Sequence, residues 1–362
     1  MSEPEHSGKP LAYLDQNILD LFSEYKEKPL LSRDSDFFRY LKEEVQAVYS
    51  PITLEEIYRS VIKGKSSKYC VEFLDILREL NAHYIALTTN EHGTLTNTIF
   101  RSWDDPLVHF NNYIENNFLN KMINPSTKNL FALYGGVKDF KTFEYKQIEA
   151  FDNLLLFLEK SLSDLKNSTY KDDYLLSEIE KFKVKIPNLM NQRDKYKSYI
   201  QRSVRHLEES NKEKSPHKSL RESLNINHDN LQKIKLPNAL NQIWKLLQEN
   251  NPELENNELD DFFQLKNLIG SEQEYYIFQK VNQIYTILNL IGYYQDEGLH
   301  KEKRFIASFS DMSHASYGCF CEYLITRDEA FAQKTNVAYE YLNIATQVFW
   351  LKLKIVLSQY FI

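Results

Sequence analysis

The stretch Ser310–Gln333, SDMSHASYGCFCEYLITRDEAFAQ, decides the fold of this chain. Asp311 and His314 are three residues apart, so they lie on one face of a predicted helix. The apolar run Tyr323–Ile325 predicts a buried strand, and a second helix begins after Asp328. Parallel α/β sheets bind ligands at the carboxyl ends of their strands. We therefore expect a metal site at Asp328, with Asp311 joining it from the neighbouring helix. The alternative is that both acids are first-turn helix residues favoured by the helix dipole.

Composition favours a large, folded, cytoplasmic protein. The 362 residues are 42% hydrophobic and 26% charged, which predicts a packed core and room for two domains or one domain with an insertion. The three cysteines are an odd number without a CxxC pair, which is typical of reduced thiols in the cytosol. No apolar run is long enough to span a membrane, so no membrane partner is expected.

The N-terminal part shows the same strand-to-helix pattern twice. Leu11–Leu14 predicts a strand that ends at Asp15, and Asn17 is placed to orient that carboxylate or to hold a water. Ala47–Tyr49 predicts a second strand, followed by a helix that carries Glu56. Each acid also has a purely structural interpretation. Asp15 suits a helix N-cap, and Glu56 suits a capping box that begins three residues earlier, at a threonine.

The middle of the chain differs from both ends. A third strand is predicted at His83–Leu87, whereas residues 94–299 show apolar residues at helical spacing and no strand pattern. Strands and helices alternate again in residues 300–362, ending with a predicted helix near 351–356. We predict an α/β fold in which a parallel-sheet domain is formed by both chain ends, residues 11–93 and 300–362. It is interrupted by a large all-α insertion, residues 94–299.

Four motifs in this order resemble those of the PIN-domain nucleases. LAYLDQNILDL (11–21) resembles their opening strand with its first metal-binding Asp, and SPITLEEI (50–57) resembles their second motif, with Glu56 as its acid. SDMSHASYG (310–318) and EYLITRDEAF (322–331) resemble the third and fourth motifs, the latter with a Thr-x-Asp turn at Thr326 and Asp328. One departure is large, because Glu56 and Asp311 are 255 positions apart, whereas family members separate these acids by some tens of residues.

This resemblance implies a PIN-like fold and a divalent-metal-dependent nuclease, most often an endoribonuclease. It implies that Mg²⁺ or Mn²⁺ binds four catalytic carboxylates, those of Asp15, Glu56, Asp311 and Asp328, and activates an attacking water. His314 is a weaker candidate for contacting the substrate, and a helix-packing histidine is its alternative. The same scaffold could serve a non-catalytic interaction protein, or a nuclease that cuts DNA. A large insertion also suits control by a protein partner or by homo-oligomer formation.

Charge is unevenly distributed along the chain. The formal net charge is −7, yet residues 181–221 hold 12 Lys and Arg against 4 Asp and Glu, a local +8 that leaves −15 for the rest. Such a basic segment steers polyanions towards one face. We expect RNA binding by Arg193, Lys197, Arg202 and Arg205, with an ordinary solvated helix surface as the alternative.

Overall fold

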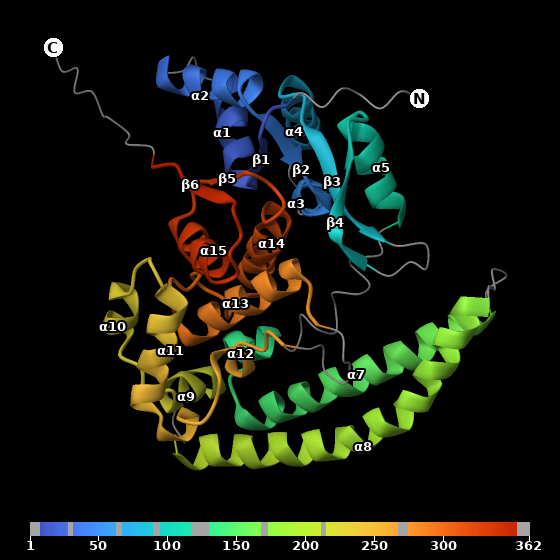
Figure 1. The fold of residues 1–362 in the computed structure, drawn as a ribbon, viewed down its shortest axis with the longest axis vertical. Coiled ribbons are helices and arrows are strands. Elements are labelled where there is room, and N and C mark those ends of the chain that lie inside the picture. Colours follow the sequence, from blue (N-terminus) through green and yellow to red (C-terminus); the bar gives the residue numbers. More distant parts are fainter. Residues whose placement is uncertain are drawn as a thin grey trace. The chain divides into compact units, whose positions relative to one another are not determined.

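The structure, a computed structural model, describes residues 8–27, 32–62, 67–89, 95–116, 130–167, 173–210, 215–266 and 274–352. These form two compact units. Unit 1 comprises Met1–Leu87, Thr98–Glu115 and Ser310–Ile362, and unit 2 comprises Thr88–Asn97 and Asn116–Phe309. The first unit is therefore assembled from distant parts of the sequence (Figure 1).

Strands and helices alternate in unit 1. The described strands are β1 (Leu11–Leu14), β2 (Gln46–Tyr49), β3 (His83–Thr89), β4 (Leu95–Ser102), β5 (Tyr323–Thr326) and β6 (Gln347–Trp350). The accompanying helices are α1 (Gln16–Glu27), α2 (Ser32–Glu43), α3 (Pro51–Ile62), α4 (Ser67–Glu79), α5 (Pro106–Asn116), α14 (Glu302–Gly318) and α15 (Glu329–Tyr341). The ends of β3, β4 and α14 extend into the residues of unit 2.

The sheet places β1 in its interior. The strand order is β4-β3-β2-β1-β5-β6, and β1 pairs in parallel with both β2 and β5. The pairs β2–β3 and β5–β6 are also parallel. Strands β2 and β5 come from opposite ends of the chain and are both buried, as expected for a parallel sheet covered on both faces. The predicted α/β class with a parallel sheet is confirmed.

A close approach between α14 and β5 fixes how the chain passes from this helix into the strand. A Cβ atom on Gly318 would lie 2.3 Å from Leu324 Cδ1 and 2.9 Å from the Tyr339 hydroxyl. Only glycine allows α14 to end against β5 at this distance. The contact sets the position of the helix that carries His314 relative to the strand that carries Thr326.

Unit 2 is mainly helical. Its longest helices are α7 (Phe140–Asn167) and α8 (Asp173–Ser210), which pack along each other (Figure 1). The shorter elements are η1 (Ala132–Gly136), α9 (Pro216–Ser223), α10 (His228–Lys233), α11 (Ala239–Asn250), η2 (Pro252–Leu254), α12 (Leu259–Phe262) and α13 (Ile277–Ile291). Arg221 ties α9 to the end of α13 by donating to the carbonyls of Asn289 and Leu290 at 3.0 and 2.9 Å.

Strand β4 differs from the expectation of helices alone between residues 94 and 299, and the helix α5 belongs to unit 1. Strand β4 forms an edge of the sheet, and α5 packs Phe110 into the core of unit 1. Five of the eight residues of β4 are polar, and most of its side chains are exposed or half-buried, so it lacks the apolar pattern of the buried strands. The predicted helix near 351–356 lies mostly outside the described residues. None of the described helices combines the length and apolar character needed to cross a bilayer.

Candidate functional site

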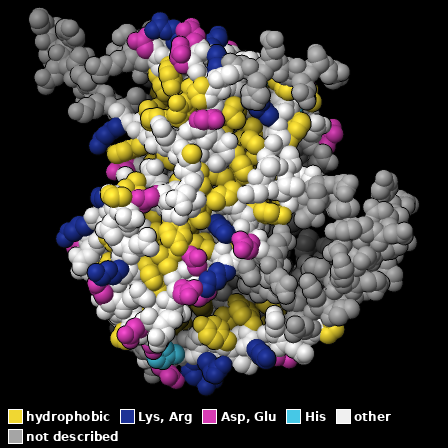
Figure 2. Space-filling view, in the orientation of Figure 1, with side chains coloured by type: hydrophobic (Ala, Val, Ile, Leu, Met, Phe, Trp, Pro, Cys, Tyr) yellow, Lys and Arg dark blue, Asp and Glu magenta, His cyan; other side chains and the backbone are white. Residues whose placement is uncertain are grey.

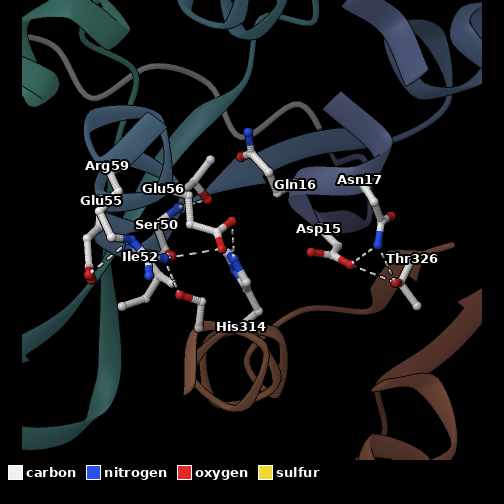
Figure 3. Close-up of polar contacts among 12 residues, drawn as sticks. Asp15, Gln16, Asn17, Ser50, Ile52, Glu55, Glu56, Arg59, His314 and Thr326 are labelled. Carbon is white, nitrogen blue, oxygen red and sulfur yellow. Dashed lines mark hydrogen bonds and ion pairs between the residues drawn. The ribbon is translucent and has the colours of Figure 1, made fainter. Parts of the chain in front are cut away.

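Asp15 lies at the carboxyl end of β1, against the end of β5. The parallel register sets Leu14 opposite Ile325, and the Asp15 amide donates to the Ile325 carbonyl at 3.1 Å. Asp15 Oδ2 accepts hydrogen bonds from Thr326 Oγ1 at 2.7 Å and from Asn17 Nδ2 at 2.5 Å. Asn17 thus contacts the carboxylate directly, which is the geometry of one of its two expected roles. The Asp15 side chain is held by two other side chains (Figure 3) and also by the backbone amide of Gln16, the first residue of α1.

Asp328 joins this group through the backbone of its turn. Its amide donates to Thr326 Oγ1 at 3.0 Å, and its Oδ1 accepts from the Phe331 amide at 2.8 Å. Asp328 is therefore the N-cap of α15, which is the structural role considered from sequence. A cap occupies one oxygen. Among the described residues, Oδ2 has no hydrogen-bond partner, so it remains available as a ligand.

Glu56 belongs to a second hydrogen-bonded group built around His314. Glu56 Oε2 lies 3.1 Å from His314 Nε2, and the other ring nitrogen, Nδ1, lies 2.7 Å from the Tyr13 hydroxyl. The Tyr13 hydroxyl also contacts Ser50 Oγ at 2.6 Å. His314 is fully buried, and Figure 3 shows it between Glu56 and the strand ends. The capping-box role does not describe Glu56, since Thr53 instead accepts from the Ser50 amide.

Arg59 provides the positive charge beside Glu56. One turn along α3, its Nη2 lies 3.4 Å from Glu56 Oε1, and its Nε lies 3.5 Å from Glu55 Oε1. Nη2 also donates to Ser310 Oγ at the start of the third motif. The Arg59 side chain is only 18% exposed, so it links α3 to α14 within the protein interior.

The pKa values in this group are perturbed in opposite directions. Burial raises the pKa of Asp15 from 3.8 to about 6, and the nearby Glu56 carboxylate adds to the rise, against His314 and Thr326. Burial also acts against the charged form of Glu56, but His314 and Arg59 outweigh it and lower the pKa of Glu56. For His314, burial is outweighed by Glu56 and Asp15, which raise its pKa. Glu56 and His314 therefore each favour the charged form of the other, whereas burial favours the neutral form of Asp15.

Asp311 lies on α14 one turn before His314 and is half-buried. The two residues share a helix face, as predicted from their spacing. Asp15 is electrostatically coupled to Glu56. Thr326 binds the Asp15 carboxylate but only the backbone amide of Asp328, so the Asp328 carboxylate takes no part in that contact. Asp311 lies on the same helix as His314.

The donor atoms of this site suit a hard divalent cation. Carboxylate oxygens are the protein ligands that Mg²⁺ and Mn²⁺ prefer, and an added positive charge would favour the ionised form of Asp15, whose pKa burial raises. Among the described residues, no three or more His, Cys, Asp or Glu side chains are grouped in a metal-binding arrangement. For Glu56 to act as a ligand, its carboxylate must exchange contacts with His314 and Arg59 for the cation.

The four predicted RNA-binding residues separate into two kinds. Arg193 forms a two-bond ion pair with Asp152 of α7, at 2.5 and 2.9 Å, and Lys197 lies close enough to lower the pKa of that carboxyl group further. Arg202 and Arg205 are exposed. Arg193 therefore joins two helices, whereas Arg202 and Arg205 face solvent.

Tyr13, Ser50 and Arg59 are site residues that the sequence analysis did not single out. Tyr13 precedes Asp15 by two residues in β1, so both side chains point to the same face of the sheet. This alternation of side chains along the strand could therefore have indicated from the sequence that Tyr13 lies beside the site. Ser50 directly precedes the Pro51 that begins α3, and its Oγ accepts from the Ile52 amide at 3.2 Å, as an N-cap does. No sequence pattern places Arg59 beside Ser310, because the two are 251 residues apart.

Comparison of this chain with models of protein families, with curated proteins and with solved structures gives no match. The likeness to PIN-domain nucleases consequently rests on the motifs quoted above.

Proposed function

We propose that this protein is a divalent-metal-dependent endoribonuclease with a PIN-like arrangement of unit 1, in which the helical residues of unit 2 are an insertion. The observation that carries the proposal is the pairing of Asp15 with Thr326 across β1 and β5, beside the Glu56–His314 pair. It supports one site assembled from motifs that are hundreds of residues apart in the sequence.

Asp15, Glu56, Asp311 and Asp328 are the residues that would hold Mg²⁺ or Mn²⁺. When bound, the cation would polarise a phosphate oxygen and neutralise charge that develops on the phosphodiester. Thr326 and Asn17 hold the Asp15 carboxylate in place through Oδ2, and preorganised ligands reduce the cost of binding. His314 Nε2 contacts the Glu56 carboxylate, which would exchange this contact for the cation.

Cleavage of RNA by the purified protein tests this function. The wild-type chain and the Asp15→Asn and Asp311→Asn variants are incubated with RNA in the presence of Mn²⁺, Mg²⁺ or EDTA. We expect cleavage by the wild type with either metal, and loss of at least about 100-fold in both variants, because an amide keeps the shape of the side chain but lacks its charge. Cleavage that persists unchanged in both variants would show that the site is assigned wrongly. Parallel reactions with DNA separate a ribonuclease from a deoxyribonuclease.

A second candidate function is a non-catalytic interaction protein on the same scaffold. It is favoured by the contacts of Glu56 and Asp328, since one is paired with His314 and the other caps a helix. Calorimetry with Mn²⁺ distinguishes the two. The enzyme predicts heat of binding that is lost in Asp311→Asn, and the scaffold predicts no binding heat in the wild type.

A further inference from the structure

The helix α8 has two dissimilar faces between residues 193 and 207. One face packs on the rest of unit 2, where Val204 joins a core with Phe140 and Phe143. Tyr196 stacks on Phe151 of α7 with ring centroids 5.0 Å apart, next to the Arg193–Asp152 ion pair. These contacts fix the rotation of α8 about its own axis, and they therefore determine which side chains point away.

The outward face carries cations around an aromatic ring. Lys195, Tyr199 and Arg202 follow each other at spacings of four and three residues, so they form one stripe along the helix, and Arg205 lies one turn further. Lys195, Arg202 and Arg205 are exposed, and Tyr199 is 61% exposed. From Lys195 to Arg205 the stripe extends for roughly 15 Å along the axis, at about 1.5 Å per residue. We call these four residues the outer face of α8.

These cations are available to an external anion. Among the described residues, Lys195 and Arg205 form no ion pair, and Arg202 donates to the Ser198 carbonyl one turn earlier. The exposed acids Glu208 and Glu209, three and four residues after Arg205, lie at the end of this face. On the face of the molecule that Figure 2 shows, the acidic and basic side chains of the described residues are interspersed. In a chain with a net charge of −7, a polyanion needs such a local basic face to bind.

We infer that the outer face of α8 binds a single strand of RNA, with Tyr199 stacking on an unpaired base and the three cations contacting phosphates. Proteins bind unpaired nucleic-acid strands with exposed aromatic rings that lie between cations, because the rings stack on bases while the cations contact phosphates. An acidic protein partner would pair with the cations but would not need the exposed ring. RNA rather than DNA is named because the inference rests on the proposed function. The inference keeps Arg202 and Arg205 from the sequence-based assignment and adds Lys195 and Tyr199, because Arg193 is paired with Asp152.

Binding of a fluorescein-labelled 12-nucleotide oligouridine in EDTA tests this inference without requiring cleavage. The triple variant Lys195→Gln/Arg202→Gln/Arg205→Gln is compared with Lys245→Gln/Lys301→Gln/Lys303→Gln, which removes equal charge from exposed positions elsewhere in unit 2. For the first variant, we expect at least about tenfold weaker binding and a salt slope reduced by about 2, at about 0.7 per lost phosphate contact. Tyr199→Ala should weaken binding at least about fivefold. The control variant should keep the wild-type affinity and slope.

Several results would overturn the inference. One is wild-type affinity and slope in the outer-face variant, and another is equal weakening in the control variant. Competition by poly-glutamate as effective as that by RNA would mean a general polyanion surface, and tighter binding of the matching oligothymidine would assign DNA. Unchanged circular dichroism and thermal midpoints show that the variants are folded. Repeating the measurement in Asp15→Asn separates the two proposals, because strand binding should persist where cleavage is lost.

Discussion

His314 Nε2 lies 3.1 Å from Glu56 Oε2, although the two residues are 258 positions apart in the sequence. The histidine is fully buried, and the glutamate side chain is 16% exposed. A buried ion pair costs desolvation, and breaking one partner leaves an uncompensated charge. The stability of unit 1 should consequently depend on the protonation of this pair.

Glu56→Gln should destabilise the protein most at mildly acidic pH. The pKa of Glu56 is lowered, so its contribution is present above about 4.5 and is lost as pH falls through its folded value. The pKa of His314 is raised, so its contribution is present below about 6.5 and is lost as pH rises through its folded value. We expect a loss of about 3 kcal/mol at pH 6 and a smaller loss at pH 9, measured by urea unfolding in EDTA. Glu55→Gln is the control, because its partner Arg59 stays charged at both pH values. An equal loss at pH 6 and pH 9 in Glu56→Gln would contradict the ion pair.

Asp15→Asn should stabilise the metal-free protein at neutral pH. Burial raises the pKa of Asp15 from 3.8 to about 6, so the folded state binds more protons and stability falls as pH rises through that interval. Asparagine does not ionise, so the variant should lack this loss of folding stability, which is at most about 3 kcal/mol. Unfolding in urea and EDTA between pH 4 and pH 8 measures it. A variant that is less stable than the wild type at pH 7 would show that the folded protein favours the charged form.

Tyr13→Phe and Tyr49→Phe should differ although both residues are fully buried in adjacent strands. The Tyr13 hydroxyl contacts both Ser50 Oγ and His314 Nδ1, and its removal leaves a buried ring nitrogen without a partner. Among the described residues, the Tyr49 hydroxyl has no hydrogen-bond partner. We expect Tyr13→Phe to cost about 1–3 kcal/mol and Tyr49→Phe to be neutral or stabilising. Thermal and urea unfolding check both, and equal costs would refute the hydrogen-bonded chain.

Thr326→Val should raise the pKa of Asp15 further. Thr326 Oγ1 donates to Asp15 Oδ2 at 2.7 Å and helps to lower the pKa of that carboxyl group. Without this donor, the charged form loses a hydrogen bond, so its protonation moves above about 6. A titration of the Asp15 side-chain carbon by NMR measures the shift. Thr335→Val is the matched control, because among the described residues that buried Oγ1 has no partner. Its titration should match the wild type.

The sequence by itself determined the local elements that surround the site. Short apolar runs predicted β1, β2 and β5, and helical periodicity predicted the helices that follow them, as the structure confirms. These patterns are readable because buried strands and amphipathic helices repeat their apolar residues over a few positions. The edge strand β4 was not predictable in this way, since its mixed, largely exposed side chains carry no clear apolar alternation.

Only the tertiary structure decided which polar groups meet. The Tyr13–His314 hydrogen bond joins residues 301 positions apart, and the Thr326–Asp15 bond joins residues 311 apart. Such pairings follow from the strand order and from the position of α14, whose last residue Gly318 lies against Leu324 of β5, and no local pattern records either. A buried histidine, moreover, is held in place by whatever partners the folded interior supplies, because leaving its nitrogens unpaired there would cost more than any local preference provides.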